Sequence, residues 1–414
     1  MYDMTRNKHI IHAFSEAKKC LLCYDPPCSK DCPANTNPGK FIRQLFFQNV
    51  KGSVRTIKNN NVLGLACGYL CPSEILCEKN CVLNNQEDSA QHIDIKYIQK
   101  EIMEYYYDNK FNAFDKQESV NQKKCAIIGG GPAGLACAFE LAKNGHAVDI
   151  YEKKEELGGV LRYGVPENRY ALKKLKAELD ELKSLEITIF NNYDFKGDKK
   201  EIEAFLKKYR ALFISVGLWK PKTLFDDASH YKDTNIFNSI DFLRRAKDSS
   251  LNADLIRNKN VTIIGGGSVA IDCATVAKDM GAKNSTIIYR RNFRQMPCER
   301  NEIFDALGQD IDVLWKTLPI SYNFDNNNVQ SLTLVQTELS GKQVTVKENA
   351  TNWNFDADIV VEAVGNTASL EFNKILEKER DKTIFTGGDF SNGAGLIVHA
   401  IRDGKAAAHK MAEV

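Results

Sequence analysis

Eight of the twelve cysteines in this 414-residue chain lie close together, between residues 20 and 81. A dense cysteine run closed by a Cys-Pro step is typical of iron–sulfur proteins, in which the last cysteine often ligates the other cluster. Four thiolates per cubane would allow two [4Fe–4S] clusters. Structural zinc is the alternative, but histidine is scarce here and eight cysteines exceed what one zinc ion needs. The spacing is Cys20-x2-Cys23-x4-Cys28-x3-Cys32-Pro33 and Cys67-x3-Cys71-Pro72-x4-Cys77-x3-Cys81.

A glycine-rich turn in the middle of the chain predicts a dinucleotide site. The apolar residues 126–128 lead into Gly129-x-Gly131-x-x-Gly134, and a helical pattern and a second apolar segment ending at Glu152 follow. This order predicts a strand–helix–strand unit that binds a pyrophosphate at the helix N-terminus. Glu152 is expected to accept hydrogen bonds from a ribose 2′-hydroxyl. The candidate binding residues are Gly129, Gly131, Pro132, Ala133, Gly134 and Glu152.

Two further features favour FAD at this site. The pair Gly158-Gly159 follows the acid closely, as in flavoenzymes with two dinucleotide domains. Near the C-terminus, Gly388-Asp389 lies between a strand-like segment (383–385) and a helical one (398–411). This arrangement resembles the second FAD motif of those enzymes, whose aspartate contacts the ribityl chain; a plain turn or an N-cap is the alternative for Asp389. Gly159, Arg169, Gly388 and Asp389 complete the candidate flavin residues.

A second unit of the same kind predicts a nicotinamide site. Residues 261–264 lead into Gly265-x-Gly267-x-x-Ala270, and the next strand-like segment (285–289) ends in Arg290-Arg291 in place of an acid. An acid there would bind a free ribose 2′-hydroxyl, whereas arginine suits a 2′-phosphate, so NADPH is expected. Solvated surface charge is the alternative for these arginines. The candidate residues are Gly265, Gly267, Ser268, Ala270, Arg290, Arg291 and Arg294.

The motifs imply an α/β chain with three parts. Residues 1–120 are expected to form an α-helical domain for two [4Fe–4S] clusters, with helices near 41–49, 54–58 and 93–107 and a linker at 116–123. Residues 121–220 and 365–414 are expected to form a Rossmann-like FAD domain, with the NADPH domain (221–364) inserted in it. The Lys/Glu-rich segment 172–185 is expected to be a solvated amphipathic helix, and 331–347 a β-meander around Ser340-Gly341.

Composition limits the possible partners and compartments. The formal net charge of +2 gives no signal for nucleic acid or for a membrane surface. No apolar run is long enough to span a bilayer and no signal peptide is evident, so a cytoplasmic location with reduced thiols is expected. Cys125, Cys137, Cys273 and Cys298 are scattered. They are expected to be mostly buried, which argues against an enzyme that passes electrons from FAD to a closely spaced dithiol.

The motifs together resemble the flavin/iron–sulfur subunit of two-subunit bacterial NAD(P)H-dependent dihydropyrimidine dehydrogenases, and the glutamate synthase small-subunit family. The resemblance covers essentially the whole chain. It departs from the family pattern at Ser268, where an aspartate or asparagine is more common. The matching segments are Cys28–Ala34, Asn37–Arg43, Gly64–Gly68, Cys71–Cys77, His92–Gln99, Gly158–Pro166 and Gly265–Asp272.

The resemblance implies an electron-input subunit. Electrons would pass from NADPH through FAD to two [4Fe–4S] clusters, and then to an FMN-containing large subunit that reduces uracil or thymine, in a hetero-oligomer. No acid–base residue is assigned, because hydride transfer is the chemistry of the cofactors. The alternatives are the small subunit of NADPH-dependent glutamate synthase, a stand-alone NADPH oxidoreductase and a non-enzymatic iron–sulfur scaffold.

The cluster ligands are open to two interpretations. By simple counting, the eight cysteines complete two clusters. The resemblance implies instead that Cys20, Cys23, Cys28 and Cys81 hold one cluster, and that Cys32, Cys71 and Cys77 hold the other. The fourth ligand of the second cluster would then be Gln99, with Cys67 spare. We favour the glutamine, because the crossed pattern also explains both Cys-Pro steps.

Overall fold

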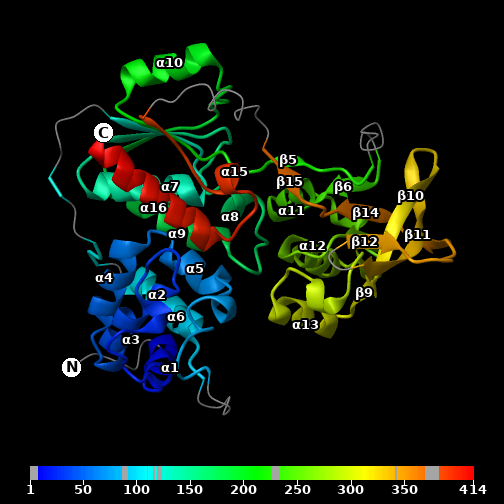
Figure 1. Cartoon of the computed structure of the whole chain (residues 1–414), viewed down its shortest axis with the longest axis horizontal. Helices are drawn as coiled ribbons and strands as arrows, with labels where there is room; N and C mark the ends of the chain where they lie inside the picture. Colours follow the sequence, from blue (N-terminus) through cyan, green and yellow to red (C-terminus); the bar gives the residue numbers. More distant parts are fainter. Residues whose placement is uncertain are drawn as a thin grey trace. The chain divides into compact units, whose positions relative to one another are not determined.

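The computed structural model of the chain describes residues 8–85, 92–109, 111–114, 117–118, 124–225, 234–340, 343–368 and 382–414. The chain divides into two compact units (Figure 1). The first unit comprises Met1–Arg162, Asn168–Leu218 and Ala368–Val414. The second comprises Tyr163–Glu167 and Trp219–Thr367, so most of it is inserted between two parts of the first.

The N-terminal part of the first unit is helical, as expected. Asn37 begins α3 with a left-handed backbone (φ 65°), and its side chain accepts a hydrogen bond from the Lys40 amide. Asn49 caps α4 by accepting from the Gly52 amide. These caps satisfy amide groups that the first turn of a helix leaves without partners. The helices are α1 (Lys8–Ala17), α2 (Pro27–Lys30), α3 (Pro38–Phe46), α4 (Val50–Asn60), α5 (Gly64–Leu70) and α6 (Ile95–Asn109).

A five-stranded parallel sheet forms the rest of the first unit. Its strand order is β16-β4-β1-β2-β3. The C-terminal strand β16 pairs in parallel with β4, which comes from the middle of the chain. Helices α7 and α16 lie on one side of the sheet and α10 on the other (Figure 1). The strands are β1 (Cys125–Ile128), β2 (Val148–Tyr151), β3 (Ile187–Phe190), β4 (Leu212–Ile214) and β16 (Ile384–Thr386). The helices are α7 (Pro132–Lys143), α8 (Val160–Tyr163), α9 (Leu172–Asp180), α10 (Lys199–Lys208), α15 (Asp389–Asn392) and α16 (Ile397–Glu413).

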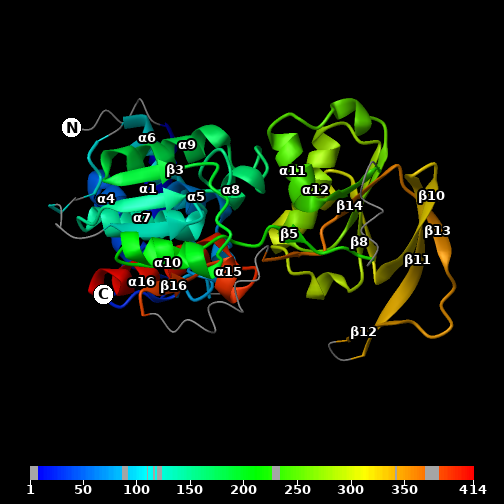
Figure 2. The same cartoon turned by 90° about the horizontal axis from the view of Figure 1, so that it is seen from above.

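The second unit contains a second parallel sheet, with the strand order β6-β14-β7-β8-β9. Apolar side chains of α11 and α12 form a core with one face of it, and strands β10 to β13 form an antiparallel sheet on the other side (Figure 2). The parallel strands are β6 (Ile236–Asn238), β7 (Asn260–Ile264), β8 (Asn284–Tyr289), β9 (Ile311–Trp315) and β14 (Ile359–Glu362). The other strands are β10 (Thr317–Asp325), β11 (Asn328–Ser340), β12 (Gln343–Val346), β13 (Trp353–Asp356), β5 (Lys220–Pro221) and β15 (Asn366–Thr367). The helices are α11 (Ser239–Lys247), α12 (Ser268–Asp279) and α13 (Arg300–Gly308).

The α/β class with two Rossmann-like sheets and a helical N-terminal part is therefore confirmed. The antiparallel pairing of β11 with β12 agrees with the expected meander, although Gly341 lies outside the described residues. Most of the expected linker at 116–123 also lies outside them. Among the described residues, no helix has both the length and the apolar character that crossing a membrane requires.

The expected amphipathic helix in segment 172–185 is present as α9, which exposes Lys173 and Lys176 and buries Leu175. The departures from the expectation are that Glu178 is buried as well and that the helix ends in a 3₁₀ turn at Glu181–Ser184. The Glu178 carboxylate accepts hydrogen bonds from the Leu65 amide (2.7 Å) and from the Tyr170 hydroxyl (2.6 Å). A buried carboxylate is stable only with such partners, so α9 fastens the sheet-bearing part of this unit to α5.

Candidate cofactor and cluster sites

The first glycine turn connects β1 to α7 at the carboxyl edge of its sheet. Gly129 has a left-handed backbone (φ 101°), and its amide donates to the Tyr151 carbonyl at 2.8 Å. A Cβ on Gly134 would lie 1.9 Å from the Gly129 carbonyl oxygen, so only glycine allows this close approach of helix and turn. Pro132 and Ala133 begin α7, directly after its N-cap Gly131. A Cβ on Gly131 would meet only the Gly159 Cα, at 3.7 Å, and backbone amides at the start of a helix fit a pyrophosphate.

Glu152 follows β2, and its carboxylate lies against this turn. One oxygen accepts from the Gly130 amide at 2.7 Å and the other from the Lys154 amide at 2.8 Å. These bonds fix the buried carboxylate at the edge of the sheet, where the expected ribose contact requires it. Gly158 donates to the Gly130 carbonyl at 2.8 Å, and Gly159 has a left-handed backbone (φ 52°). The second glycine pair thus lies directly beside the first turn.

The C-terminal flavin motif reaches the same place. A Cβ on Gly388 (φ 64°) would lie 3.1 Å from the Cβ of Ala133 at the start of α7. Asp389 begins α15 and accepts from the Gly395 amide at 3.1 Å. Burial, with a smaller effect of Asp403, raises the pKa of Asp389 to about 6. Arg169 lies half-buried between α8 and α9 in the same unit.

Two residues that support this motif were missed in the sequence. Asp403 accepts from the Gly388 amide (3.1 Å) and from the Asn392 side chain (2.7 Å), which holds both ends of α15 in place. A Cβ on Gly404 would lie 2.1 Å from the Ala133 carbonyl oxygen, so glycine allows α16 to approach α7 closely. A glycine inside a helix lowers helix stability by about 1 kcal/mol relative to alanine. A glycine at position 404 of a helical pattern therefore indicates close packing, and this was the signal that the sequence offered.

The second glycine turn connects β7 to α12. The Gly265 amide donates to the Ile288 carbonyl at 3.1 Å, and a Cβ on Gly265 would lie 2.4 Å from the Ala363 carbonyl oxygen. Gly267 caps α12, and a Cβ there would meet nothing within 4 Å. Ser268 is the first residue of the helix, and Ala270 is buried at the place of the third glycine. Open space beside these amides fits a second dinucleotide.

The three arginines follow β8 on the same edge of this sheet. Arg290 and Arg294 are exposed and Arg291 is half-exposed. The Arg290 carbonyl accepts from the Thr337 hydroxyl at 2.8 Å, and the Arg291 carbonyl accepts from the Lys316 amide at 3.0 Å. These bonds hold the backbone, while none of the ion pairs within the described ranges involves the three guanidinium groups. Such groups can bind a phosphate in bidentate fashion.

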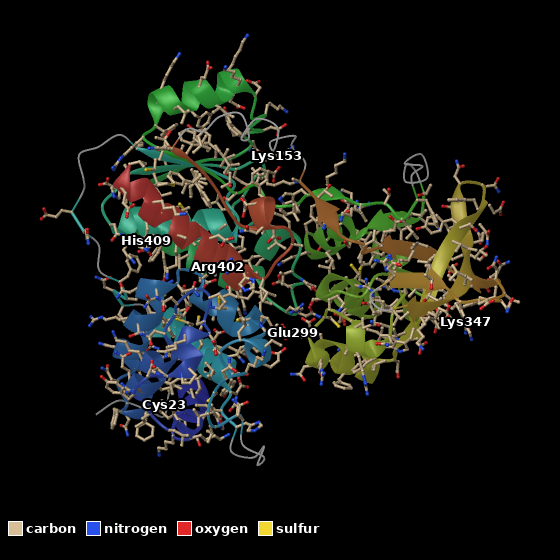
Figure 3. The ribbon with its side chains drawn as sticks, viewed as in Figure 1. Cys23, Lys153, Glu299, Lys347, Arg402 and His409 are labelled. Carbon is tan, nitrogen blue, oxygen red and sulfur yellow. The ribbon has the colours of Figure 1, made fainter. Side chains whose placement is uncertain are left out.

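The eight N-terminal cysteines line two cavities in the helical part of the first unit. The first is lined by Cys20, Cys23, Cys28 and Cys81. The second is lined by Cys32, Cys67, Cys71 and Cys77 together with Gln99. Figure 3 labels Cys23 in this part, away from the sheet. The grouping is therefore crossed. Cys81, from the second cysteine segment, lines the first cavity, and Cys32, from the first segment, lines the second.

The sulfur environment fits iron–sulfur clusters. The Leu22 amide donates to Cys20 Sγ and the Thr36 amide to Cys32 Sγ, each at 3.4 Å. Hydrogen bonds to cysteine sulfur are among the factors that set cluster potentials. Burial and the neighbouring thiols raise the pKa of Cys28 to about 12, and burial raises that of Cys77 well above its ordinary value. Thiols crowded in this way become thiolates only beside a cation, which bound iron would supply.

Two residues are candidates for the fourth ligand of the cluster in the second cavity. Gln99 is buried on α6, and its Nε2 donates to the Gly64 carbonyl at 2.7 Å, so its oxygen is the atom that would ligate iron. Cys67 is buried on α5, and its sulfur accepts from Asn61 Nδ2 at 3.3 Å. In the described part of the chain, no three Cys, His, Asp or Glu side chains converge on a single metal ion. Several irons in one cluster suit thiols that are spread around a cavity.

The other four cysteines form no dithiol. Cys125, Cys137 and Cys273 are buried on β1, α7 and α12, and Cys298 is half-buried in a loop. The expectation of scattered, mostly buried thiols is confirmed. These four thiols therefore do not form a closely spaced pair that could accept electrons from a flavin.

Comparisons with known proteins agree with this geometry. Residues 2–111 match a family described as dihydropyrimidine dehydrogenase domain II, 4Fe-4S cluster, and residues 123–404 match the pyridine nucleotide-disulphide oxidoreductase family. The solved structure of FprA from Mycobacterium tuberculosis with NADPH aligns with a TM-score of 0.58 and 18% identity, over 71% of this chain and 84% of that one. The two matching families define the chain as an NAD(P)H-dependent flavin oxidoreductase with an N-terminal iron–sulfur domain.

Curated relatives narrow the family. The chain is 32% identical to the NAD-dependent dihydropyrimidine dehydrogenase subunit PreT of Escherichia coli K12 over 407 residues, which cover 96% of this chain and 92% of that protein. It is 25% identical to the glutamate synthase [NADPH] small chain of Azospirillum brasilense, over 96% of this chain and 88% of that one. The chain belongs to the PreT family.

Two single substitutions test which residue completes the second cavity. We expect Cys67→Ser to retain the iron of both clusters, because its sulfur would be spare. We expect Gln99→Ala to lose one cluster, about half the iron, or to change its spectrum, because an oxygen ligand would be missing. Iron content and EPR of the reduced protein measure both effects. Loss of a cluster in Cys67→Ser, with both signals unchanged in Gln99→Ala, would show that the eight cysteines suffice.

Proposed function

We propose that this chain is the electron-input subunit of a dihydropyrimidine dehydrogenase. In this role it binds NADPH in the second unit and FAD and two [4Fe–4S] clusters in the first. Its electrons go to an FMN-containing large subunit that reduces uracil or thymine. When bound, FAD would accept hydride from NADPH and release electrons singly to the clusters. The residues of the chain orient these groups, exclude water and set their potentials.

The observation that carries the proposal is the pair of thiol-lined cavities in the same compact unit as the flavin-type turn. Glu178 binds α5, the helix that carries Cys67 and precedes Cys71, and this fastens one cavity to the sheet-bearing part. Such a direct connection suits electron transfer, which needs cofactors at fixed separations. The crowded thiols also suit the reducing cytoplasm, where we propose that the chain works.

The residues that we propose to hold the cofactors are those brought together at three places. Glu152 and Asp389 would bind hydroxyl groups of FAD beside the glycine pairs. Arg290, Arg291 and Arg294 would bind the 2′-phosphate of NADPH. Gln99 would complete the cluster held by Cys32, Cys71 and Cys77. The other cluster ligands would be Cys20, Cys23, Cys28 and Cys81.

The names of the relatives differ in the nicotinamide nucleotide that they give, NAD or NADPH. The PreT relatives are named NAD-dependent, and the glutamate synthase small chains are named for NADPH. The arginine pair after β8 supports NADPH for this chain, because two guanidinium groups there can pair with a phosphate that NADH lacks. The second candidate function, a glutamate synthase small subunit, is supported by relatives of 24–27% identity along nearly the whole chain.

The arginine pair predicts at least about a tenfold preference for NADPH over NADH in kcat/KM, which corresponds to about 1.4 kcal/mol of transition-state binding. Rates of dye reduction with each nucleotide measure it in the purified chain. Replacing both residues (Arg290→Ala with Arg291→Ala) is expected to abolish the preference by weakening NADPH alone. Equal rates in the unmodified chain, or no effect of the double substitution, would contradict the assignment.

The division of labour predicts that the isolated chain, loaded with FAD and iron, reduces artificial dyes but not uracil. Product analysis for dihydrouracil with and without the co-purifying large subunit tests this. Dihydrouracil formed only by the complex supports the proposal. Glutamate formation by the complex would indicate the glutamate synthase alternative. Robust uracil turnover by the chain alone would overturn the proposed role. Full activity on a small acceptor, with no partner subunit that co-purifies, would overturn it as well.

A further inference from the structure

One lysine of the C-terminal helix contacts the backbone of the cysteine-bearing part at two places, one of them two residues after Cys32. Lys405 lies on α16, the helix on which Figure 3 labels Arg402 and His409. Its Nζ donates to the carbonyl oxygens of Ala34 and Asn60, each at 2.7 Å. Ala34 comes two residues after Cys32, and Asn60 ends α4. A single ammonium group from the helix that follows the flavin motif therefore holds the cysteine loop.

The charge of this lysine is not neutralised by an acid in contact with it. Within the described ranges, no salt bridge involves Lys405, and its two contacts are both to neutral carbonyl groups. Burial lowers the pKa of Lys405, while Glu140 and the Cys32 thiol act in the opposite direction. A cation near the end of α4 also interacts favourably with the partial negative charge of that helix C-terminus.

A neighbouring lysine provides the contrast. Lys143 on α7 donates to the Asn59 carbonyl at 2.8 Å, one residue from the Asn60 contact of Lys405. Lys143 also forms an ion pair with Glu140 at 3.0 Å, which compensates its charge. Both lysines thus hold the end of α4, but only Lys405 lacks an ion pair among the described residues and binds the loop after Cys32.

The same helix contributes to one cavity. Val398 of α16 lines the cavity of Cys32, Cys71 and Cys77, whereas the residues that line the cavity of Cys20, Cys23 and Cys28 all come from the N-terminal helical part. Reducing a cluster adds one negative charge to it. A fixed cation nearby stabilises that charge and raises the reduction potential, more so in a partly buried setting than in water.

We propose that Lys405 is a positioning residue that holds the Cys32 loop and raises the reduction potential of the cluster at Cys32, Cys71 and Cys77. This inference rests on the proposed function, because it requires that cluster to be present. By favouring the reduced form of this cluster, Lys405 would favour electron transfer out of the flavin. The cluster at Cys20, Cys23, Cys28 and Cys81 would be affected much less.

Redox titration of the purified, FAD- and iron-loaded chain, followed by EPR, tests the inference. Lys405→Gln retains an N–H donor for the carbonyls but removes the charge. We expect Lys405→Gln to lower the one-electron reduction equilibrium constant of the cluster at Cys32, Cys71 and Cys77 by at least about tenfold, which is a fall of about 59 mV in its reduction potential. The reduction potential of the other cluster is expected to shift much less. Lys405→Arg retains the charge and is expected to restore most of the potential. Lys143→Gln is the matched control, with little expected shift in either cluster.

The outcomes separate this inference from the proposed function. Two clusters in the unmodified chain with no shift in Lys405→Gln, or with equal shifts in Lys405→Gln and Lys405→Arg, would overturn the role of the charge and leave the proposed function intact. Fewer than two clusters in the unmodified chain would overturn both. If Lys405→Gln loses the cluster, Lys405→Arg decides: retention at the original potential supports the role of the charge, and loss overturns it.

Discussion

The crowding of eight thiols into two cavities is the constraint on which the N-terminal part of this chain depends. Burial raises the pKa of Cys28 and Cys77 because a thiolate loses its hydration there, and repulsion between neighbouring thiolates raises it further. A domain of short helices gains little from such an arrangement unless iron converts repulsion into ligation. Metal binding would then be part of the folding free energy of this region. The crossed use of Cys32 and Cys81 ties both ends of the region to both cavities.

The second requirement is a fixed connection between the cavities and the flavin-type sheet. Two side chains from the sheet-bearing part supply it within the first unit. Glu178 binds the backbone at the start of α5 from α9, and Lys405 binds Ala34 and Asn60 from α16. Burial raises the pKa of Glu178 to about 7, while Lys58 and the bonds from Tyr170 and Leu65 act to lower it. Both contacts are polar, buried at Glu178 and partly buried at Lys405, so they fix one relative position of the parts in contact.

The sequence predicted the local features well, because each depends on a few neighbouring residues. The turns at Gly129 and Gly265 need glycine for backbone geometry or close approach, and the order of strand, turn and helix is visible in the chain. The two cysteine groups have a spacing that only a few kinds of site share. The crossed grouping of Cys81 and Cys32 came from family resemblance, since spacing alone does not define which distant thiols meet.

The features that were missed depend on long-range contacts. Glu178 lies in a Lys/Glu-rich pattern that indicates a solvated helix, and its partner Leu65 is 113 residues away. Asp403, Gly404 and Lys405 lie inside an ordinary amphipathic helix. Strand β10 was missed because Pro319 lowers strand propensity, and the structure accommodates it at a register shift between Pro319 and Ser321.

We propose that this one chain holds a flavin and two [4Fe–4S] clusters in its first unit. Native mass spectrometry of the anaerobically purified chain, with iron, sulfide and flavin determined on the same sample, tests it most directly. We predict about eight irons and about eight sulfides for each FAD, which corresponds to two cubanes. Zinc in place of iron, or about four irons for each FAD with all eight cysteines intact, would contradict the account.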